Sequence, residues 1–179
     1  MKNAIILAAA TIFFIACNNE KKEEPKTESA KETTSSVQLP YTAGYSSQFN
    51  DKVSDQDLLT VLNSYKYWES GDMKGAASTL ADSVYWVSWS GERYSGLKAG
   101  LVDRWGKFRD SLSSVQITMD GWTKDHSIDK NDDFILVWYK EIDTYKTGKV
   151  DSADYHDINQ LKNGKIYWYS TYRQELKQK

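Results

Sequence analysis

One carboxylate of the sequence is placed where it could act as a general acid or base. Asp157 lies in a run of strand-forming residues that ends at Asn163-Gly164, and a second such run follows. Asn-Gly favours a two-residue hairpin turn, because both central positions need φ > 0. Counting outward from this turn places Asp157 opposite Ser170 in the predicted hairpin. Alternate residues of a strand share one face of a sheet, so the neighbours of Asp157 can be predicted.

The face that carries Asp157 is predicted to line a pocket. Extending the pairing through a turn at Thr147-Gly148 places Trp138 opposite Asp157, with Trp168 close by. A carboxylate between two indole rings loses hydration, which raises its pKa towards that of a useful acid or base. Apolar cavities with a few converging polar groups are the usual small-molecule sites. The predicted ligand-binding residues are Trp86, Trp138, Tyr155, Asn159, Trp168 and Ser170.

A structural interpretation of these residues stays open. Asp157 could be half exposed at a sheet edge, or it could only hydrogen-bond Ser170. Asn159 could equally be a structural hydrogen-bonding group or a ligand contact. The sequence alone does not decide between these interpretations.

The opposite face of the same strands is predicted to be an interface. It is apolar, and if helices cover the Asp157 face it stays exposed unless a partner hides it. We therefore expect a homodimer through the sheet. The residues predicted on this face are Ile135, Val137, Tyr139, Ile158, Tyr167 and Tyr169.

Several other chemistries are disfavoured by the residue types. The two histidines, His126 and His156, show no metal-ligand spacing, so we expect no metal site. The chain has no G-x-S-x-G, P-loop or dinucleotide-binding motif, and no cofactor is expected. The formal net charge is −2 with acidic and basic residues mixed, which argues against binding to nucleic acid.

The first 49 residues are predicted to be an export signal and a tether. An apolar run from Ala4 to Ala16, too short to span a bilayer, ends at Cys17, the only cysteine. This ending resembles the lipobox of bacterial lipoproteins, in which the cysteine is acylated, for example with palmitate, and becomes the mature N-terminus. Residues 1–16 would then be a signal peptide, and residues 17–49 the acylated cysteine and a disordered tether. An ordinary secretory signal with an incidental Cys17 is the alternative.

A lipidated Cys17 would place the protein in the envelope of a Gram-negative bacterium. Several acyl chains on one residue anchor a protein without a transmembrane helix, so the expected location is the outer membrane. The charged run Glu20–Glu24 resembles the acidic export signals of some surface-exposed lipoproteins, but it could also be a plain spacer. Both the periplasmic and the surface face therefore stay open.

The rest of the chain predicts helices followed by strands. Helical spacing of apolar residues is seen over residues 54–70, 72–80 and 97–112. Strand patterns cover residues 83–89, 93–96, 115–119, 134–145, 150–161 and 166–172. Helices that precede and interrupt a run of antiparallel strands, instead of alternating with them, predict an α+β fold.

This order of elements resembles the NTF2-like superfamily, in particular its SnoaL-like and ketosteroid-isomerase-like branch. The matching residues are Trp68-x-x-Gly71-Asp72, Leu80-x-Asp82, Gly96, Leu161–Ile166 and Tyr172. The resemblance implies a curved antiparallel sheet wrapped around three helices, a cone with a deep pocket formed by residues 50–176, often as a dimer. Cyclases of the family use an acidic residue on a late strand, and the best matching position is Asp157. Donors like those of the isomerases have no clear equivalent.

Three functions follow from this pattern. The first is an envelope lipoprotein whose pocket binds a small apolar or aromatic molecule. The second is an isomerase, cyclase or dehydratase that uses Asp157 as general acid or base. The third is a non-catalytic assembly protein that binds a partner through the sheet face. The first is favoured, because acid–base chemistry needs a second polar partner near Asp157, and Ser170 and Tyr155 are weak candidates.

Overall fold

The computed structural model describes residues 39–176, in which Tyr41 and the residues after it form one compact unit. The predicted signal peptide and Cys17 lie outside the described residues. No helix within residues 39–176 is long and apolar enough to cross a membrane. The elements are β1 (Phe49–Asn50), α1 (Asp55–Ser70), α2 (Met73–Thr79), β2 (Leu80–Val87), β3 (Arg93–Leu97), α3 (Lys98–Arg109), β4 (Leu112–Ser127), β5 (Asp132–Tyr145), β6 (Val150–Lys162) and β7 (Lys165–Glu175).

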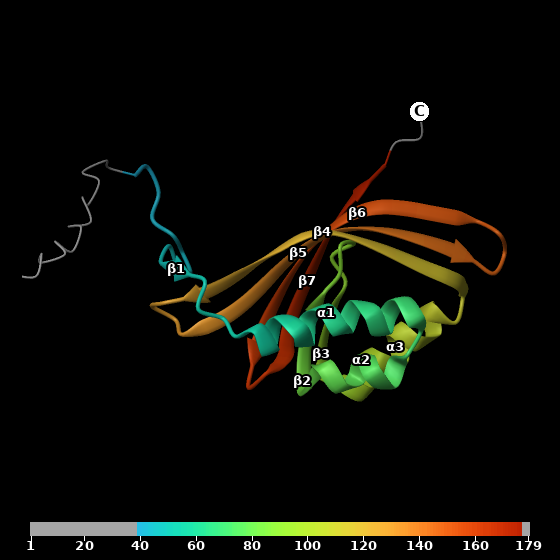
Figure 1. Ribbon diagram of the computed structural model, residues 1–179, viewed down its shortest axis with the longest axis horizontal. Helices are drawn as coiled ribbons and strands as arrows, with labels where there is room; N and C mark the ends of the chain where they lie inside the picture. The colour runs from blue at the N-terminus through green and yellow to red at the C-terminus, as the bar shows by residue number, and fades with distance from the viewer. Residues whose placement is uncertain (1–38, 177–179) are drawn as a thin grey trace, which may run out of the picture. The chain divides into compact units, whose positions relative to one another are not determined.

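These elements confirm the predicted α+β class. One sheet has the strand order β1-β4-β5-β6-β7-β2-β3, and it curves over the three helices (Figure 1). The strands β4 to β7 form an antiparallel meander, while β2 pairs with β7 in the parallel direction. The sheet is therefore mixed, and not antiparallel throughout as the resemblance implied.

The first two helices begin and end where the sequence places caps. The Ser54 hydroxyl accepts a hydrogen bond from the Asp57 backbone N–H at 3.0 Å and starts α1. Gly71 ends α1 with φ of 77°, a left-handed conformation that glycine adopts without strain. The Asp72 carboxylate then accepts from the backbone N–H of Gly75 at 2.8 Å and caps α2. Together these caps turn the chain sharply between the two helices.

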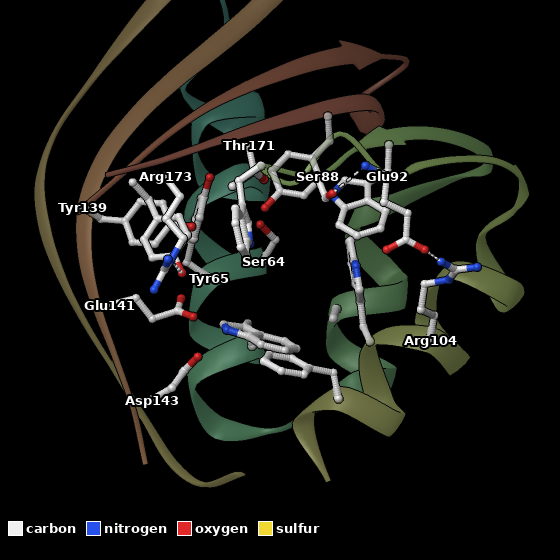
Figure 2. A pocket seen from close by; sticks show the side chains of 18 of the residues that line it. Ser64, Tyr65, Ser88, Glu92, Arg104, Tyr139, Glu141, Asp143, Thr171 and Arg173 are labelled. Atoms are coloured by element: carbon white, nitrogen blue, oxygen red, sulfur yellow. Dashed lines mark hydrogen bonds and ion pairs between the residues drawn. The ribbon is translucent and has the colours of Figure 1, made fainter. Parts of the chain in front are cut away.

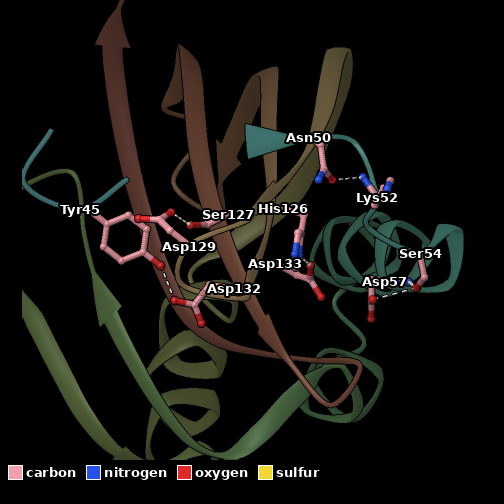
Figure 3. Close-up of polar contacts among 10 residues, drawn as sticks. All are labelled: Tyr45, Asn50, Lys52, Ser54, Asp57, His126, Ser127, Asp129, Asp132 and Asp133. Carbon is pink, nitrogen blue, oxygen red and sulfur yellow. Dashed lines mark hydrogen bonds and ion pairs between the residues drawn. The ribbon is translucent and has the colours of Figure 1, made fainter. Parts of the chain in front are cut away.

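Residues 45–50 lie against the end of β4 and its turn to β5 (Figure 3). The ring of Tyr45 packs edge-on against Phe134 with ring centroids 5.9 Å apart, and its hydroxyl bonds the carboxylate of Asp132. The two-residue strand β1 pairs with the end of β4. Residues 45–49, predicted to belong to the tether, thus contact the compact unit through fixed partners.

The predicted pairing of β6 with β7 is wrong by one residue. The Asn163-Gly164 turn forms as predicted, with Lys162 opposite Lys165 and Leu161 opposite Ile166. Tyr167 is then an extra residue in β7, because the next pair is Gln160 with Trp168. This bulge shifts every later pair, so Asp157 lies opposite Thr171 and not Ser170.

The predicted pairing of β5 with β6 is also wrong by one residue. The two strands are joined by a three-residue loop, Lys146–Gly148, instead of the two-residue turn that was predicted. The Tyr145 backbone N–H bonds the carbonyl of Lys149 at 2.8 Å, and Gly148 has φ of 86°. Asp157 therefore lies opposite Val137 and not Trp138.

The two register shifts reverse the predicted roles of the faces of β5 and of most of β7. Ile135, Val137 and Tyr139, predicted on an exposed dimer face, are buried against the helices. Trp138 instead lies on the outer face, where 37% of its surface is exposed. Asp157 and Asn159 on β6 do face inward as predicted. The core thus combines the inner face of β5 and β6 with buried residues of α1, α3, β2 and β7.

The faces of β5 can be tested with a pair of substitutions. Val137→Asp places a carboxylate at a fully buried position, and we expect it to lower the free energy of unfolding by more than about 3 kcal/mol. Trp138→Asp is the matched control on the outer face and should lower it by about 1 kcal/mol or less. Urea unfolding measures both values. A larger loss for Trp138→Asp would contradict the observed register.

Candidate functional site

A cavity of about 400 Å³ lies between the inner face of the sheet and the helices (Figure 2). Its walls are largely aromatic. The ten aromatic side chains that line it are Tyr65, Trp68, Trp86, Trp89, Trp105, Phe108, Tyr139, Tyr145, Tyr155 and Tyr169. The ring of Trp105 makes edge-to-face contacts with Trp86 and Tyr169, with centroids 6.4 and 6.1 Å apart. Such contacts hold the rings in place, so the walls are preformed.

The structure places half of the predicted ligand-binding residues at this cavity. Trp86, Tyr155 and Asn159 line it. The three others do not, because the register shifts turn them to the other face. Ser170 pairs with Ile158, Trp168 pairs with Gln160, and Trp138 packs on His156 with ring centroids 4.7 Å apart. These three predictions are therefore wrong.

Asp157 is held by three tyrosine hydroxyls behind the cavity wall. Tyr65 on α1, Tyr139 on β5 and Tyr169 on β7 all donate to its Oδ2, at 2.9, 3.0 and 3.1 Å. The residue is fully buried and is not among those that line the cavity. The tyrosines therefore separate the predicted catalytic carboxyl from any ligand in the cavity.

The environment of Asp157 changes its ionisation. Burial raises the pKa of this carboxyl to about 7, although the three tyrosine hydroxyls act to lower it. Its second oxygen, Oδ1, has no hydrogen-bond partner among the described residues. In turn, burial and the neighbouring Asp157 charge raise the pKa of Tyr65, Tyr139 and Tyr169 well above the usual range of a phenol. The tyrosines thus stay protonated donors.

Asn159 connects this cluster to the sheet. Its side-chain amide donates to the carbonyl of Ile135 at 3.2 Å and to the Tyr65 hydroxyl at 3.3 Å. It lines the cavity as well. Both interpretations of Asn159 from the sequence are therefore compatible with its place, since it orients Tyr65 and also reaches the cavity.

Two buried acids of the cavity escaped the sequence analysis. Glu141 and Asp143 alternate on the inner face of β5, with 8% and 6% of their surfaces exposed. Figure 2 shows both carboxyl groups pointing from the strand towards the interior. Burial raises the pKa of both groups, and the negative charge of Asp143 adds to the rise at Glu141. The alternation of Tyr139, Glu141 and Asp143 is the signal that the correct register would have revealed.

Arg173 also lines the cavity, and its guanidinium has polar partners. It donates to the Tyr155 hydroxyl at 3.1 Å and to the Asp151 and Glu175 carboxylates at 2.8 and 2.9 Å. It lies over the ring of Trp89, 4.9 Å from the centroid. In residues 39–176, no cluster of three or more acidic, histidine or cysteine side chains could hold a metal ion.

The ionisation of Asp157 gives a prediction for stability. The folded-state pKa of about 7 exceeds the ordinary value of 3.8, so the unfolded chain releases this proton first as the pH rises. Stability should therefore fall between about pH 4 and pH 7, by at most about 1.4 kcal/mol per pH unit from this group. Asp157→Asn should remove the part of this loss of stability that Asp157 causes. Urea unfolding at a series of pH values measures the free energy of unfolding of both proteins.

The matched control is Asp154→Asn on the outer side of the same strand. It should keep the wild-type change of stability with pH. If Asp157→Asn also leaves the pH dependence unchanged, Asp157 does not titrate in this range and burial does not raise its pKa.

Comparison with known proteins supports the fold. No family model and no curated protein matches the sequence. Solved structures do: a Mycobacterium tuberculosis LEH-like epoxide hydrolase has a TM-score of 0.58 at 9% identity, over 68% of this chain and 84% of that one. AusH from Aspergillus nidulans has a TM-score of 0.56 at 15% identity, over 71% of this chain and 89% of that one. An NTF2-like protein of unknown function from Exiguobacterium has a TM-score of 0.55 at 16% identity, over 65% of this chain and 99% of that one. This chain therefore has the NTF2-like fold.

Proposed function

We propose that this protein is an envelope lipoprotein whose cavity binds a small molecule with a largely apolar or aromatic body. The proposal rests on one observation: the cavity has aromatic walls, and two of its lining residues carry buried polar atoms without a hydrogen-bond partner. Among the described residues, the indole N–H of Trp86 and the Oδ1 of Asp143 are buried without a hydrogen-bond partner. Both residues line the cavity. Buried polar atoms are nearly always paired, so a ligand that bonds both would complete the site.

The size and chemistry of the cavity support this proposal. A volume of about 400 Å³ falls within the range of small-molecule sites. Aromatic rings contribute large apolar contact areas, and their fixed geometry lowers the entropy lost on binding. Trp138 and Trp168 leave this space open because they lie on the outer face. A role in assembly alone would leave the preformed cavity without a purpose.

Acid–base catalysis is the second candidate function. Glu141 and Asp143 reach the cavity, and burial raises the pKa of both towards neutrality, where a group can both take up and release a proton. Asp157 is enclosed, so in such a reaction it would be a positioning residue that orients the tyrosine hydroxyls. Turnover that is lost in Glu141→Gln while ligand binding persists would favour this candidate.

A homodimer remains part of the proposal, through a different set of residues from the predicted one. The outer face carries a row of rings in which His156 lies between Trp138 and Tyr172, with centroids 4.7 and 6.0 Å away. Tyr172 has 56% of its surface exposed. Exposed aromatic rows of this kind favour association. Sedimentation of the chain without its lipid anchor measures the oligomeric state.

The cavity can be tested with a neutral probe, 4-phenylbutan-1-ol. We expect saturable binding to the wild-type chain by calorimetry, and at least about tenfold weaker binding to Trp105→Ala, because a wall ring and its two edge-to-face contacts are lost. Trp138→Ala, which removes an outer-face indole, is the matched control and should bind as the wild type does. Equal losses in the two variants, or no binding at all, would contradict a ligand site in the cavity.

The lipid anchor can be tested separately on the full-length chain. The wild type should be found in the membrane fraction, and mass spectrometry should show acyl chains on an N-terminal Cys17. Cys17→Ser should abolish the added mass and the membrane association. Wild-type protein recovered without acyl chains from the soluble fraction would instead favour an ordinary secretory signal.

A further inference from the structure

When ionised, Glu141 and Asp143 give the cavity a negative charge that no cation of the cavity lining neutralises through an ion pair. Four carboxylates and two guanidinium groups line the cavity. Two of the carboxylates are paired with these cations, Glu92 with Arg104 and Asp151 with Arg173. Among the described residues, no ion pair involves the carboxyl groups of Glu141 or Asp143. The ionised pair would therefore leave two negative charges uncompensated inside the cavity.

The two cations whose charges act on Asp143 have other partners. Arg173 on β7 lowers the pKa of Asp143, but its guanidinium bonds Asp151, Tyr155 and Glu175. Arg109 on α3 acts on Asp143 in the same direction, while its guanidinium donates to two backbone carbonyls at the end of α1, at 3.1 and 3.0 Å. The Oδ1 of Asp143, in a residue only 6% exposed, is left without a hydrogen-bond partner in the described part of the chain.

Aromatic rings line the same cavity as the acid pair. Phe108 stacks on Trp68 with centroids 6.0 Å apart and meets Tyr145 edge-on at 6.4 Å. Tyr139 and Tyr155 stack with centroids 5.2 Å apart. The faces of such rings carry partial negative charge and attract cations. Rings and carboxylates together are the surroundings that stabilise an ammonium group out of water.

We propose that the ligand of this cavity carries a protonated nitrogen, as in an arylalkylamine, whose ammonium group binds between Glu141 and Asp143 while its apolar body contacts the aromatic walls. This inference rests on the proposed ligand-binding function and names the class of ligand. An ammonium group donates three hydrogen bonds, so it can satisfy Asp143 Oδ1 and still reach Glu141. It also supplies the positive charge that the cavity lacks.

Binding of a cation must change the protonation of the acid pair. Without ligand, burial raises the pKa of both groups and the negative charge of Asp143 raises that of Glu141 further, which favours a proton on the pair. The ammonium group replaces that proton, so binding should release protons to the buffer and strengthen as the pH rises from 5 to 8. The charged groups that face the pair from other elements are Asp151, Asp157, Arg109 and Arg173.

The inference is tested with 4-phenylbutylamine and its neutral counterpart, 4-phenylbutan-1-ol. Calorimetry at pH 7.5 should show the amine binding about 10- to 100-fold more tightly than the alcohol, because its hydrogen bonds are charge-assisted. Repeating the titration in buffers of different ionisation enthalpy should reveal the released protons. The double variant Glu141→Gln, Asp143→Asn should lose the preference for the amine, so that the amine and the alcohol bind about equally well.

A control variant and a stability measurement keep the outcomes distinct. Asp154→Asn, on the outer face of β6, should keep the wild-type preference for the amine, and thermal unfolding should show that every variant is folded. Alcohol binding that equals or exceeds amine binding overturns the inference and leaves the proposed function standing. An amine preference that survives the double variant also overturns it. Failure of both probes to bind contradicts the inference and the proposed function together.

Discussion

The structure depends on one buried carboxylate that four elements enclose. Asp157 on β6 accepts hydrogen bonds from tyrosines on α1, β5 and β7, all at the same oxygen. A buried charge is tolerated only when hydrogen bonds replace its hydration, and hydroxyls from three elements supply them here. The cluster therefore fixes the distance between α1 and the sheet. It also leaves the aromatic rings of Tyr65, Tyr139 and Tyr169 as part of the cavity wall.

The three buried acidic side chains of the inner face differ in their access to the cavity. Asp157 is enclosed and hydrogen-bonded, whereas Glu141 and Asp143, further along β5, reach the cavity. Burial is the main cause of the raised pKa of all three carboxyl groups. The enclosed group orients side chains, and the two open groups are available to a ligand. Asp157 was thus predicted on the correct face, but the acidic side chains that reach the cavity lie on the neighbouring strand β5.

The sequence predicted much of the fold because its local signals agree with the final structure. Caps at Ser54 and Gly71 bound α1, and Asn163-Gly164 forms the predicted turn with both residues at positive φ. Two features were beyond the pattern. The bulge at Tyr167 is an extra residue within an ordinary strand sequence, and Lys146–Gly148 forms a three-residue loop in place of the expected two-residue turn. A shift of one residue exchanges the faces, so Trp138, Trp168 and Ser170 were predicted inside, while Glu141 and Asp143 were missed.

Three inward carboxyl groups, those of Glu141, Asp143 and Asp157, are buried in this fold. Their ionisation can be followed directly by carbon NMR of the side-chain carboxyls between pH 3 and pH 9. We expect all three to titrate above the ordinary range of acidic side chains, with Asp157 near pH 7. Titration of all three near pH 4 would contradict their burial in this fold.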